Sequence, residues 1–180
     1  MRLVMDSGGV NVNWISFRDS ASEEGEDRLD ELIAQMTMTE KIAQLHGSDW
    51  MDTADNVRLG IPGFRTADGP HGLRGGKSTS FPAGIAMAAT WDLELLERVG
   101  IAMGKEFLGR GRNQVLGPCL DITRDPRNGR GPESGGEEPY LVAKIGEALV
   151  WGIQSTKAIA TPKHLAATNH QRDRRNADHK

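Results

Sequence analysis

The segment Gln114-Val-Leu-Gly-Pro-Cys-Leu-Asp-Ile122 carries the plainest strand signal in this sequence, because its apolar residues run on almost without interruption. Runs of this kind are typical of buried strands, as in parallel sheets. A loop rich in Gly, Pro, Arg and Glu follows over Thr123–Pro139, and an apolar stripe at helical spacing then predicts a helix over Tyr140–Gln154. The short run Ala158–Thr161 predicts the next strand. Strand, loop, helix and strand in this order are the α/β pattern with parallel strands.

The same alternation extends toward the N-terminus. Ile61–Ala67 is predicted as a strand that ends in the turn signal Asp68-Gly69-Pro70, and the small apolar run Phe81–Ala89 as a further strand with its loop. Asp92 stands at an N-cap position before a helix that is predicted to reach about Leu108. About four strand–helix units result, whereas a complete (β/α)8 barrel takes roughly 250 residues. The prediction is therefore an α/β chain that forms a partial (β/α)8 TIM-type barrel, although a doubly wound sheet shows the same pattern at this level.

The N-terminal part is predicted to be a disordered leader over residues 1–26, since Ser20–Asp27 is acidic and polar and offers little to bury. The barrel domain is assigned to residues 27–180. Within it, Thr37-Met-Thr-Glu40 is a capping-box pattern that predicts a short helix, which Gly47 is expected to end.

The amino-acid composition excludes several classes of protein. The chain has 180 residues and a formal net charge of −3, so it lacks the basic excess of proteins that bind nucleic acid or membrane surfaces. The single cysteine, Cys119, cannot form an internal disulfide. No apolar run approaches the roughly 20 residues of a membrane-spanning helix, and no signal peptide is seen, so the location stays unknown with the cytoplasm favoured. No cofactor or metal is expected.

Three groups of polar residues follow predicted strands, where α/β enzymes place their sites. Asp68 could accept two hydroxyl hydrogen bonds from a sugar and Arg74 could close over the same ligand, although Asp-Gly-Pro is also ordinary turn chemistry. The loop Asp125–Glu133 crowds arginines and carboxylates, which could equally form a solvated ion-pair network. Lys163 and His164 could hold adjacent hydroxyls, or form a basic pair that faces solvent.

A fourth segment, Arg74-Gly-Gly-Lys-Ser-Thr79, approaches the phosphate-binding P-loop pattern. That pattern requires a glycine where this chain has His71, and Phe81-Pro82 blocks the helix that should follow. An unrelated α/β enzyme with a phosphate or nucleotide ligand nevertheless stays open as an alternative.

Five motifs occur in a fixed order along the chain: Asp68-Gly-Pro-His-Gly-Leu-Arg74, Phe81-Pro-Ala-Gly with Ala89-Thr-Trp-Asp92, Gly117-Pro-Cys-Leu-Asp-Ile-Thr-Arg-Asp-Pro-Arg-Asn-Gly-Arg130, Glu137-Glu-Pro-Tyr-Leu141, and Lys163-His164. Together they resemble the N-terminal (β/α)8 domain of glycoside hydrolase family 3, the β-glucosidase family. The resemblance runs from about Leu29 to about Arg175.

The resemblance implies a binding role for five residues. Asp68, Arg130, Lys163 and His164 would hold the sugar in the −1 subsite, and Arg74 would line the same pocket.

Other positions match the family less closely. Asp92 is a weaker candidate ligand, because N-capping explains it adequately. The chain also departs from the family pattern K-H-F-x-x-N-x-x-E, and from a common Trp, so substrate grip or local packing is expected to differ at Leu165, Thr168, Gln171 and Asn128.

Retaining hydrolysis needs two carboxyl groups about 5–5.5 Å apart. In the family the nucleophile is an Asp on a later strand, in a motif resembling S-D-W, and the acid/base usually lies in a second domain. Ser48-Asp49-Trp50 spells that tripeptide here, but before the first site strand, and is interpreted as coincidence.

The resemblance thus implies a β-glucosidase-like hydrolase that acts on non-reducing-end β-linked sugars by a retaining mechanism. This chain would be a truncated part that holds the sugar-binding residues and neither catalytic carboxylate. The alternative is a non-catalytic carbohydrate-binding or partner-dependent piece. An unclosed barrel also leaves free sheet edges, which predicts self-association.

Overall fold

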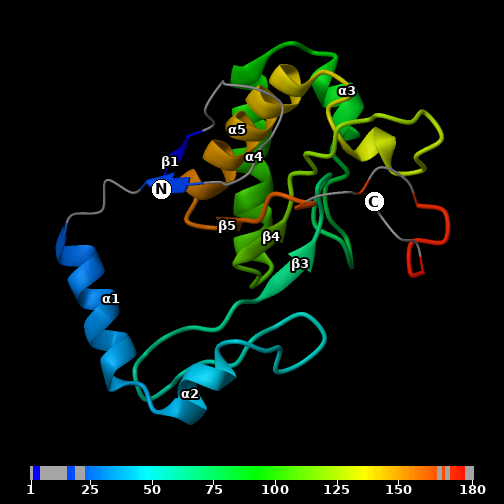
Figure 1. Ribbon diagram of the computed structural model, residues 1–180. Helices are drawn as coiled ribbons and strands as arrows, with labels where there is room; N and C mark the ends of the chain where they lie inside the picture. Colours follow the sequence, from blue (N-terminus) through cyan, green and yellow to red (C-terminus); the bar gives the residue numbers. More distant parts are fainter. Residues whose placement is uncertain (1, 5–15, 19–22, 166–167, 169–170, 177–180) are drawn as a thin grey trace. The chain divides into compact units, whose positions relative to one another are not determined.

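The computed structural model describes residues 2–4, 16–18, 23–165, 168 and 171–176. They fall into two compact units, Met1–Arg65 and Thr66–Lys180. Figure 1 labels the elements of each unit. No helix within the described ranges is long and apolar enough to cross a bilayer.

Among its described residues, the first unit contains a pair of short strands and two helices. β1 (Arg2–Val4) pairs with β2 (Ser16–Arg18) in antiparallel fashion. α1 spans Glu23–Gln35 and α2 spans Met38–Ala43.

The predicted capping box at the start of α2 is confirmed. The Thr37 hydroxyl accepts a hydrogen bond from the Glu40 backbone N–H at 3.2 Å, and the Glu40 carboxylate accepts one from the Thr37 N–H at 2.8 Å. Arg58 donates to the same carboxylate at 2.6 and 2.7 Å, and this hydrogen bonding lowers the pKa of Glu40 to about 2. α2 ends at Ala43, before the expected stop at Gly47.

The structure differs from the predicted disordered leader. β1 and β2 lie inside residues 1–26, and α1 begins at Glu23, before the expected start of order at Asp27. Val4 and Phe17 are of residue types that favour strands, and a Glu-rich run favours the first turn of a helix. The prediction considered only the polarity of this region and missed both preferences. Residues 5–15 and 19–22 of the leader lie outside the described residues.

The second unit is built on a three-stranded parallel sheet. Its strands are β3 (Thr66–Asp68), β4 (Gln114–Leu116) and β5 (Ile159–Ala160), in the order β3-β4-β5. α4 (Leu93–Gly109) lies between β3 and β4 in the chain, and α5 (Pro139–Ser155) lies between β4 and β5. Parallel strands need such crossover connections. The two predicted helices and the parallel sheet are confirmed, while the strands are shorter than predicted.

The prediction of a strand in Phe81–Ala89 is wrong, because this segment forms the helix α3 (Gly84–Ala88). A short apolar run does not distinguish a strand from a buried helix, and Ala and Met favour the helix. Met87 is buried with Leu96 of α4 and Ile145 of α5, so helix packing decides the outcome. The described part of the second unit therefore has three parallel strands where four were expected.

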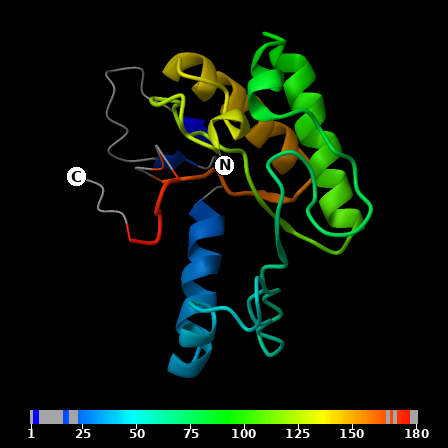
Figure 2. The same ribbon diagram turned by 90° about the vertical axis from the view of Figure 1, so that its right-hand side faces the viewer.

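α4 and α5 lie side by side in both ribbon views (Figures 1 and 2). Phe107 of α4 and Ile153 of α5 form a core with Ala67 of β3 and Val115 of β4. Phe107 and Val115 are fully buried, with 0% of their surface exposed. This core fixes the strands whose carboxyl ends carry the site.

Candidate functional site

The carboxyl ends of the parallel strands bring distant residues together. Asp68 is the last residue of β3, while Lys163 and His164 follow β5. Lys163 also forms a parallel bridge with Cys119, which continues the alignment of β4 and β5 beyond their ends. The backbone thereby places the three strand-end segments at one edge of the sheet.

Asp68 is the centre of the first ionic cluster. Lys163 Nζ donates to its Oδ1 at 2.6 Å, and Arg74 Nη1 donates to its Oδ2 at 3.3 Å. Burial alone would raise the pKa of Asp68, but the hydrogen bonds and charges of Lys163 and Arg74 outweigh it and hold the pKa below its usual value. The Lys163 side chain is 16% exposed and that of Arg74 is 80% exposed, so Lys163 is the structural partner and Arg74 reaches from solvent.

An open hollow of about 280 Å³ lies beside this cluster, lined by residues 68–74 and 78–80. The hollow offers both the Asp68 carboxylate and backbone groups of a glycine-rich turn to a small ligand. The segment that approaches a P-loop lines part of it, but no helix follows Lys77 until α3 begins at Gly84. The phosphate-binding arrangement at a helix N-terminus is therefore not formed here.

Arg130 is the centre of a second cluster. Its Nε and Nη2 donate to the two Glu133 carboxylate oxygens, each at 2.9 Å, and this bidentate pair lowers the pKa of Glu133. Its Nη1 lies 3.0 Å from His164 Nε2, and His164 Nδ1 lies 2.7 Å from Asp121 Oδ2. A continuous set of hydrogen bonds therefore joins Glu133, Arg130, His164 and Asp121.

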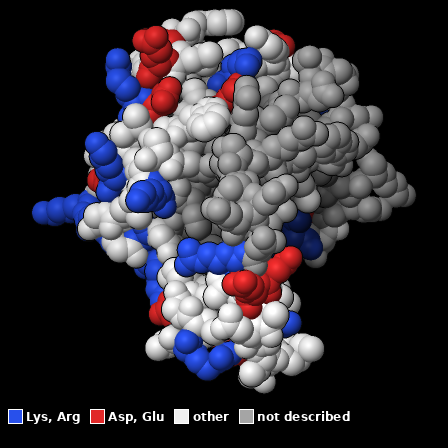
Figure 3. Space-filling model, turned by 90° about the vertical axis from the view of Figure 1, so that its left-hand side faces the viewer, with Lys and Arg blue, Asp and Glu red and all other residues white. Residues whose placement is uncertain are grey.

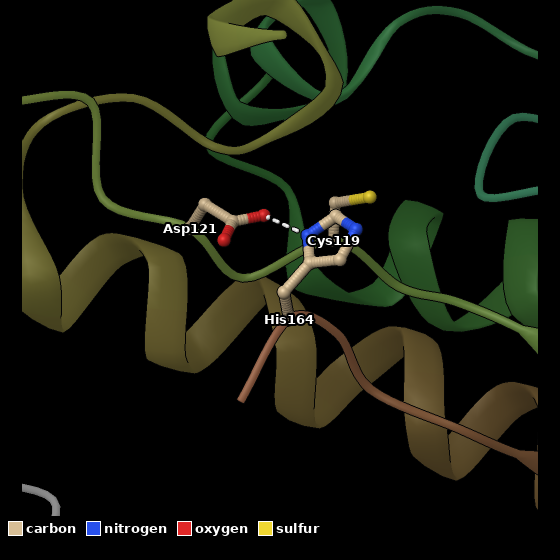
Figure 4. A group of neighbouring side chains, drawn as sticks. All are labelled: Cys119, Asp121 and His164. Atoms are coloured by element: carbon tan, nitrogen blue, oxygen red, sulfur yellow. Dashed lines mark hydrogen bonds and ion pairs between the residues drawn. The ribbon is translucent and has the colours of Figure 1, made fainter. Parts of the chain in front are cut away.

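Within the described residues, Cys119, Asp121 and His164 place a sulfur, a carboxylate oxygen and a ring nitrogen within 4.8 Å of one another (Figure 4). Such a set is one that zinc accepts. Its surroundings oppose a cation, since the guanidinium of Arg130 contacts His164. Burial also raises the pKa of the Cys119 thiol to about 12, which disfavours the thiolate that binds metal. The group therefore fits a neutral polar ligand better than a metal ion.

The five predicted binding residues all lie in these two clusters. Asp68, Arg74 and Lys163 form the first, while Arg130 and His164 belong to the second, and the adjacency of Lys163 and His164 in the chain joins the two.

Two further residues were not selected from the sequence. Asp121 and Glu133 hold His164 and Arg130 in place. Asp121 stands inside a quoted motif and Glu133 ends the loop Asp125–Glu133, so the available signal was a carboxylate close to a candidate binding residue.

Residues outside the clusters have local roles. The Asp92 side chain accepts from the Leu95 N–H at 2.9 Å as the N-cap of α4. Asp49 accepts from the Met51 N–H at 3.3 Å within a turn of the first unit. Asn128, one of the departures from the family pattern, is buried and donates to the Thr168 carbonyl at 3.4 Å, so two of the departures contact each other.

Figure 3 shows how charged side chains are distributed over one face of the molecule. Outside the atoms drawn in grey, blue and red side chains occur with uncharged surface between them, and no continuous basic surface forms. This distribution is in line with the formal net charge of −3.

A sequence profile described as the glycosyl hydrolase family 3 N terminal domain matches residues 11–176. The probable beta-glucosidase H of Aspergillus fumigatus is 38% identical over 156 residues, which cover 83% of this chain and 19% of that protein. A beta-glucosidase from Rhizobium radiobacter is 39% identical over 153 residues, which cover 81% of this chain and 19% of that protein. The chain thus spans about a fifth of the length of these curated relatives.

Solved structures agree with the sequence matches. The crystal structure of beta-glucosidase from Kluyveromyces marxianus in complex with glucose matches with a TM-score of 0.76 and 37% identity, over 79% of this chain and 18% of that chain. Beta-glucosidase 3B from Thermotoga neapolitana in complex with alpha-D-glucose matches with a TM-score of 0.71 and 32% identity, over 79% of this chain and 24% of that chain.

Proposed function

Because the chain belongs to glycosyl hydrolase family 3, within its N-terminal domain, we propose that its second unit binds the non-reducing-end sugar of a β-linked glycoside. The activity of the whole protein would be that of a retaining β-glucosidase, in keeping with the names of its relatives. In the same proposal, the sheet β3-β4-β5 with α4 and α5 is the beginning of a (β/α)8 barrel.

One observation carries the proposal: two polar pairs lie at the carboxyl end of the same parallel sheet. Lys163 Nζ lies 2.6 Å from Asp68 Oδ1, and Arg130 Nη1 lies 3.0 Å from His164 Nε2. Carboxylate oxygens accept hydrogen bonds from sugar hydroxyls, while ammonium and guanidinium groups donate to them. The cluster therefore offers both kinds of partner to a ligand rich in hydroxyls, beside an open hollow.

The described carboxylates near this site are poorly suited to act as the general acid. Asp68 and Glu133 have pKa values below their usual ranges, whereas the general acid of a glycosidase needs a raised pKa. Asp121 accepts from His164. A lowered pKa does not oppose a nucleophile, but the family motif that resembles S-D-W belongs to a later strand than those of this site. We therefore propose that residues 1–180 supply sugar binding and that the nucleophile and acid/base do not lie among them.

Calorimetric titration of the purified chain with glucose tests the binding role, with ATP as the competing ligand class. We expect glucose to bind and Asp68→Asn to weaken it about ten- to a hundredfold, because a hydrogen bond to a charged group contributes about 1.5–3 kcal/mol. Asp125→Asn is the matched control, since Asp125 is buried to the same extent as Asp68, with side chains 30% and 31% exposed, but pairs with Arg127. Binding of ATP without glucose would favour a phosphate-binding enzyme instead.

Release of nitrophenol from a nitrophenyl β-glucoside tests the catalytic part of the proposal. We expect no turnover by the chain at high protein concentration. Turnover that persists through repurification and is lost on Asp49→Asn would assign the nucleophile to Asp49 and overturn the proposal.

A further inference from the structure

We infer that Asp121 is a positioning residue, which holds His164 in the tautomer that carries its proton on Nδ1 and so presents Nε2 as a hydrogen-bond acceptor. The inference rests on the proposed function only for its consequence in sugar recognition. The positioning itself follows from the contacts of the side chains.

Two contacts assign the same tautomer independently. A guanidinium has donors and no acceptor, so His164 Nε2, 3.0 Å from Arg130 Nη1, must accept. The proton of a neutral imidazole is then on Nδ1, which faces a carboxylate oxygen of Asp121 at 2.7 Å. Figure 4 shows this carboxylate aimed at the ring edge.

Arg130 cannot turn freely to avoid an Nε2–H group. Two of its nitrogens are held by the bidentate pair with Glu133, at 2.9 Å each. The Asp121 side chain is also only 15% exposed, so its contact with His164 is sheltered from water. If the ring carried its proton on Nε2, that N–H group would face the Arg130 Nη1 donor. The Asp121 carboxylate would then lack a hydrogen-bond donor.

The tautomer decides which ring nitrogen of His164 accepts a hydrogen bond. The single lone pair of His164 Nε2 accepts from Arg130 Nη1, so the ring holds the guanidinium in place, while hydroxyls that reach Lys163 or Arg130 accept from them. Asp121 thus positions Arg130 through His164, although it need not touch the sugar.

Ring-nitrogen NMR of the 180-residue chain tests the assignment at about pH 8, where an ordinary imidazole is neutral. His164→Gln identifies the His164 signals. We expect the wild-type chain to carry the His164 proton on Nδ1, Asp121→Ala to populate the Nε2–H form, and Asp121→Asn to retain the wild-type tautomer through its amide oxygen. Asp125→Asn, a change to a half-buried carboxylate of the neighbouring loop that pairs with Arg127, should leave the His164 signals unchanged.

A wild-type His164 protonated on Nε2, or signals that do not respond to Asp121→Ala in a chain whose near-UV circular dichroism is intact, would overturn the inference. If Asp121→Ala fails to fold, the wild-type signals still decide the tautomer, and a proton on Nε2 refutes it. Glucose titration provides the second measurement, with about a tenfold loss of affinity expected for Asp121→Ala and recovery of most of it in Asp121→Asn. The NMR measurement needs no sugar, so absence of glucose binding in the wild-type chain would count against the proposed function and not against the role of Asp121.

Discussion

Arg130 and His164, two of the candidate binding residues, are each held by a carboxylate outside the predicted set of ligands. Glu133 fixes the plane of Arg130 and Asp121 orients His164. Such partners cut the loss of side-chain freedom on binding, because the binding groups are already in place before the ligand arrives. The site is therefore preorganised by carboxylates as much as by cations.

Acidification is expected to destabilise the second unit. Lys163 and Arg74 outweigh burial and hold the pKa of Asp68 below its usual 3.8, while the hydrogen bonds from Arg130 hold that of Glu133 below its usual 4.5. The unfolded chain therefore takes up protons first as the pH falls, so this stabilisation is complete above about pH 5 and is lost progressively below about pH 4. Urea unfolding midpoints between about pH 7 and about pH 3 measure the loss.

The loss of stability at low pH should depend on the ion pair between Asp68 and Lys163. Asp68→Asn is expected to flatten the fall of the midpoint at low pH, whereas Asp49→Asn, a change to an exposed turn residue, should not. Equal slopes in all three proteins would contradict the role given to Asp68.

Asp92 provides a second prediction at the level of one side chain. Because its carboxylate caps α4 through the Leu95 N–H at 2.9 Å, Asp92→Ala is expected to cost about 1 kcal/mol in the free energy of unfolding. Asp92→Ser, which retains a capping oxygen, should recover most of the loss. Glucose affinity should be the same in all three chains, and a large loss of affinity would show that Asp92 is a ligand as well as a cap.

The crossing of α4 and α5 depends on two glycines. A Cβ on Gly100 of α4 would lie 2.6 Å from the Leu149 carbonyl oxygen of α5, and one on Gly152 would lie 2.2 Å from the Glu97 oxygen. Both obstacles are backbone atoms, so the helices would have to move apart. This close approach seats Phe107 and Ile153 over the sheet that carries the site.

Gly100→Ala is therefore expected to destabilise the chain by about 1–3 kcal/mol, the usual cost of overpacking. Gly109→Ala in the same helix is the matched control, since a Cβ there would have no neighbour within 4 Å. The control should be neutral or gain up to about 1 kcal/mol, because Ala favours the helix over Gly. Chemical denaturation of both variants measures the difference, and a stabilised Gly100→Ala would mean that the helices separate at little cost.

At the scale of the whole molecule, the second unit has an open sheet. In its described residues, β3 and β5 each pair on one side only, and open strand edges invite pairing with another chain. Large apolar side chains are also exposed nearby, with Ile159 of β5 at 38% and Leu165 at 97%. Neither unit covers these groups with residues of its own in the described ranges.

The isolated chain is therefore expected to dimerise or aggregate, and light scattering over a range of concentrations measures this. Ile159→Lys should reduce the association, because a charge on an edge strand opposes pairing. Leu108→Lys on α4 is the matched control, since Leu108 has the same exposed fraction of 38%. A compact monomer with sharp near-UV circular dichroism and one cooperative melt would contradict the prediction.

Local patterns in the sequence were sufficient for α2, α4 and α5, and they also supplied the candidate binding residues. The apolar stripes of α4 and α5, the capping box at Thr37 and the N-cap at Asp92 are short-range features, formed by residues a few positions apart. The five candidate binding residues follow strands or a recognisable loop motif, so their placement at one sheet edge also followed from order along the chain. The helices and their caps can be predicted because the interactions that form them lie within one or two turns.

Other features were decided by contacts between distant segments. Gly84–Ala88 is helical because Met87 finds a buried position against α4 and α5. The partners Asp121 and Glu133 have no distinctive spacing in the sequence, since a carboxylate can meet an arginine or a histidine from many positions. Only the folded chain selects the pairs, through burial that makes an unpaired charge costly.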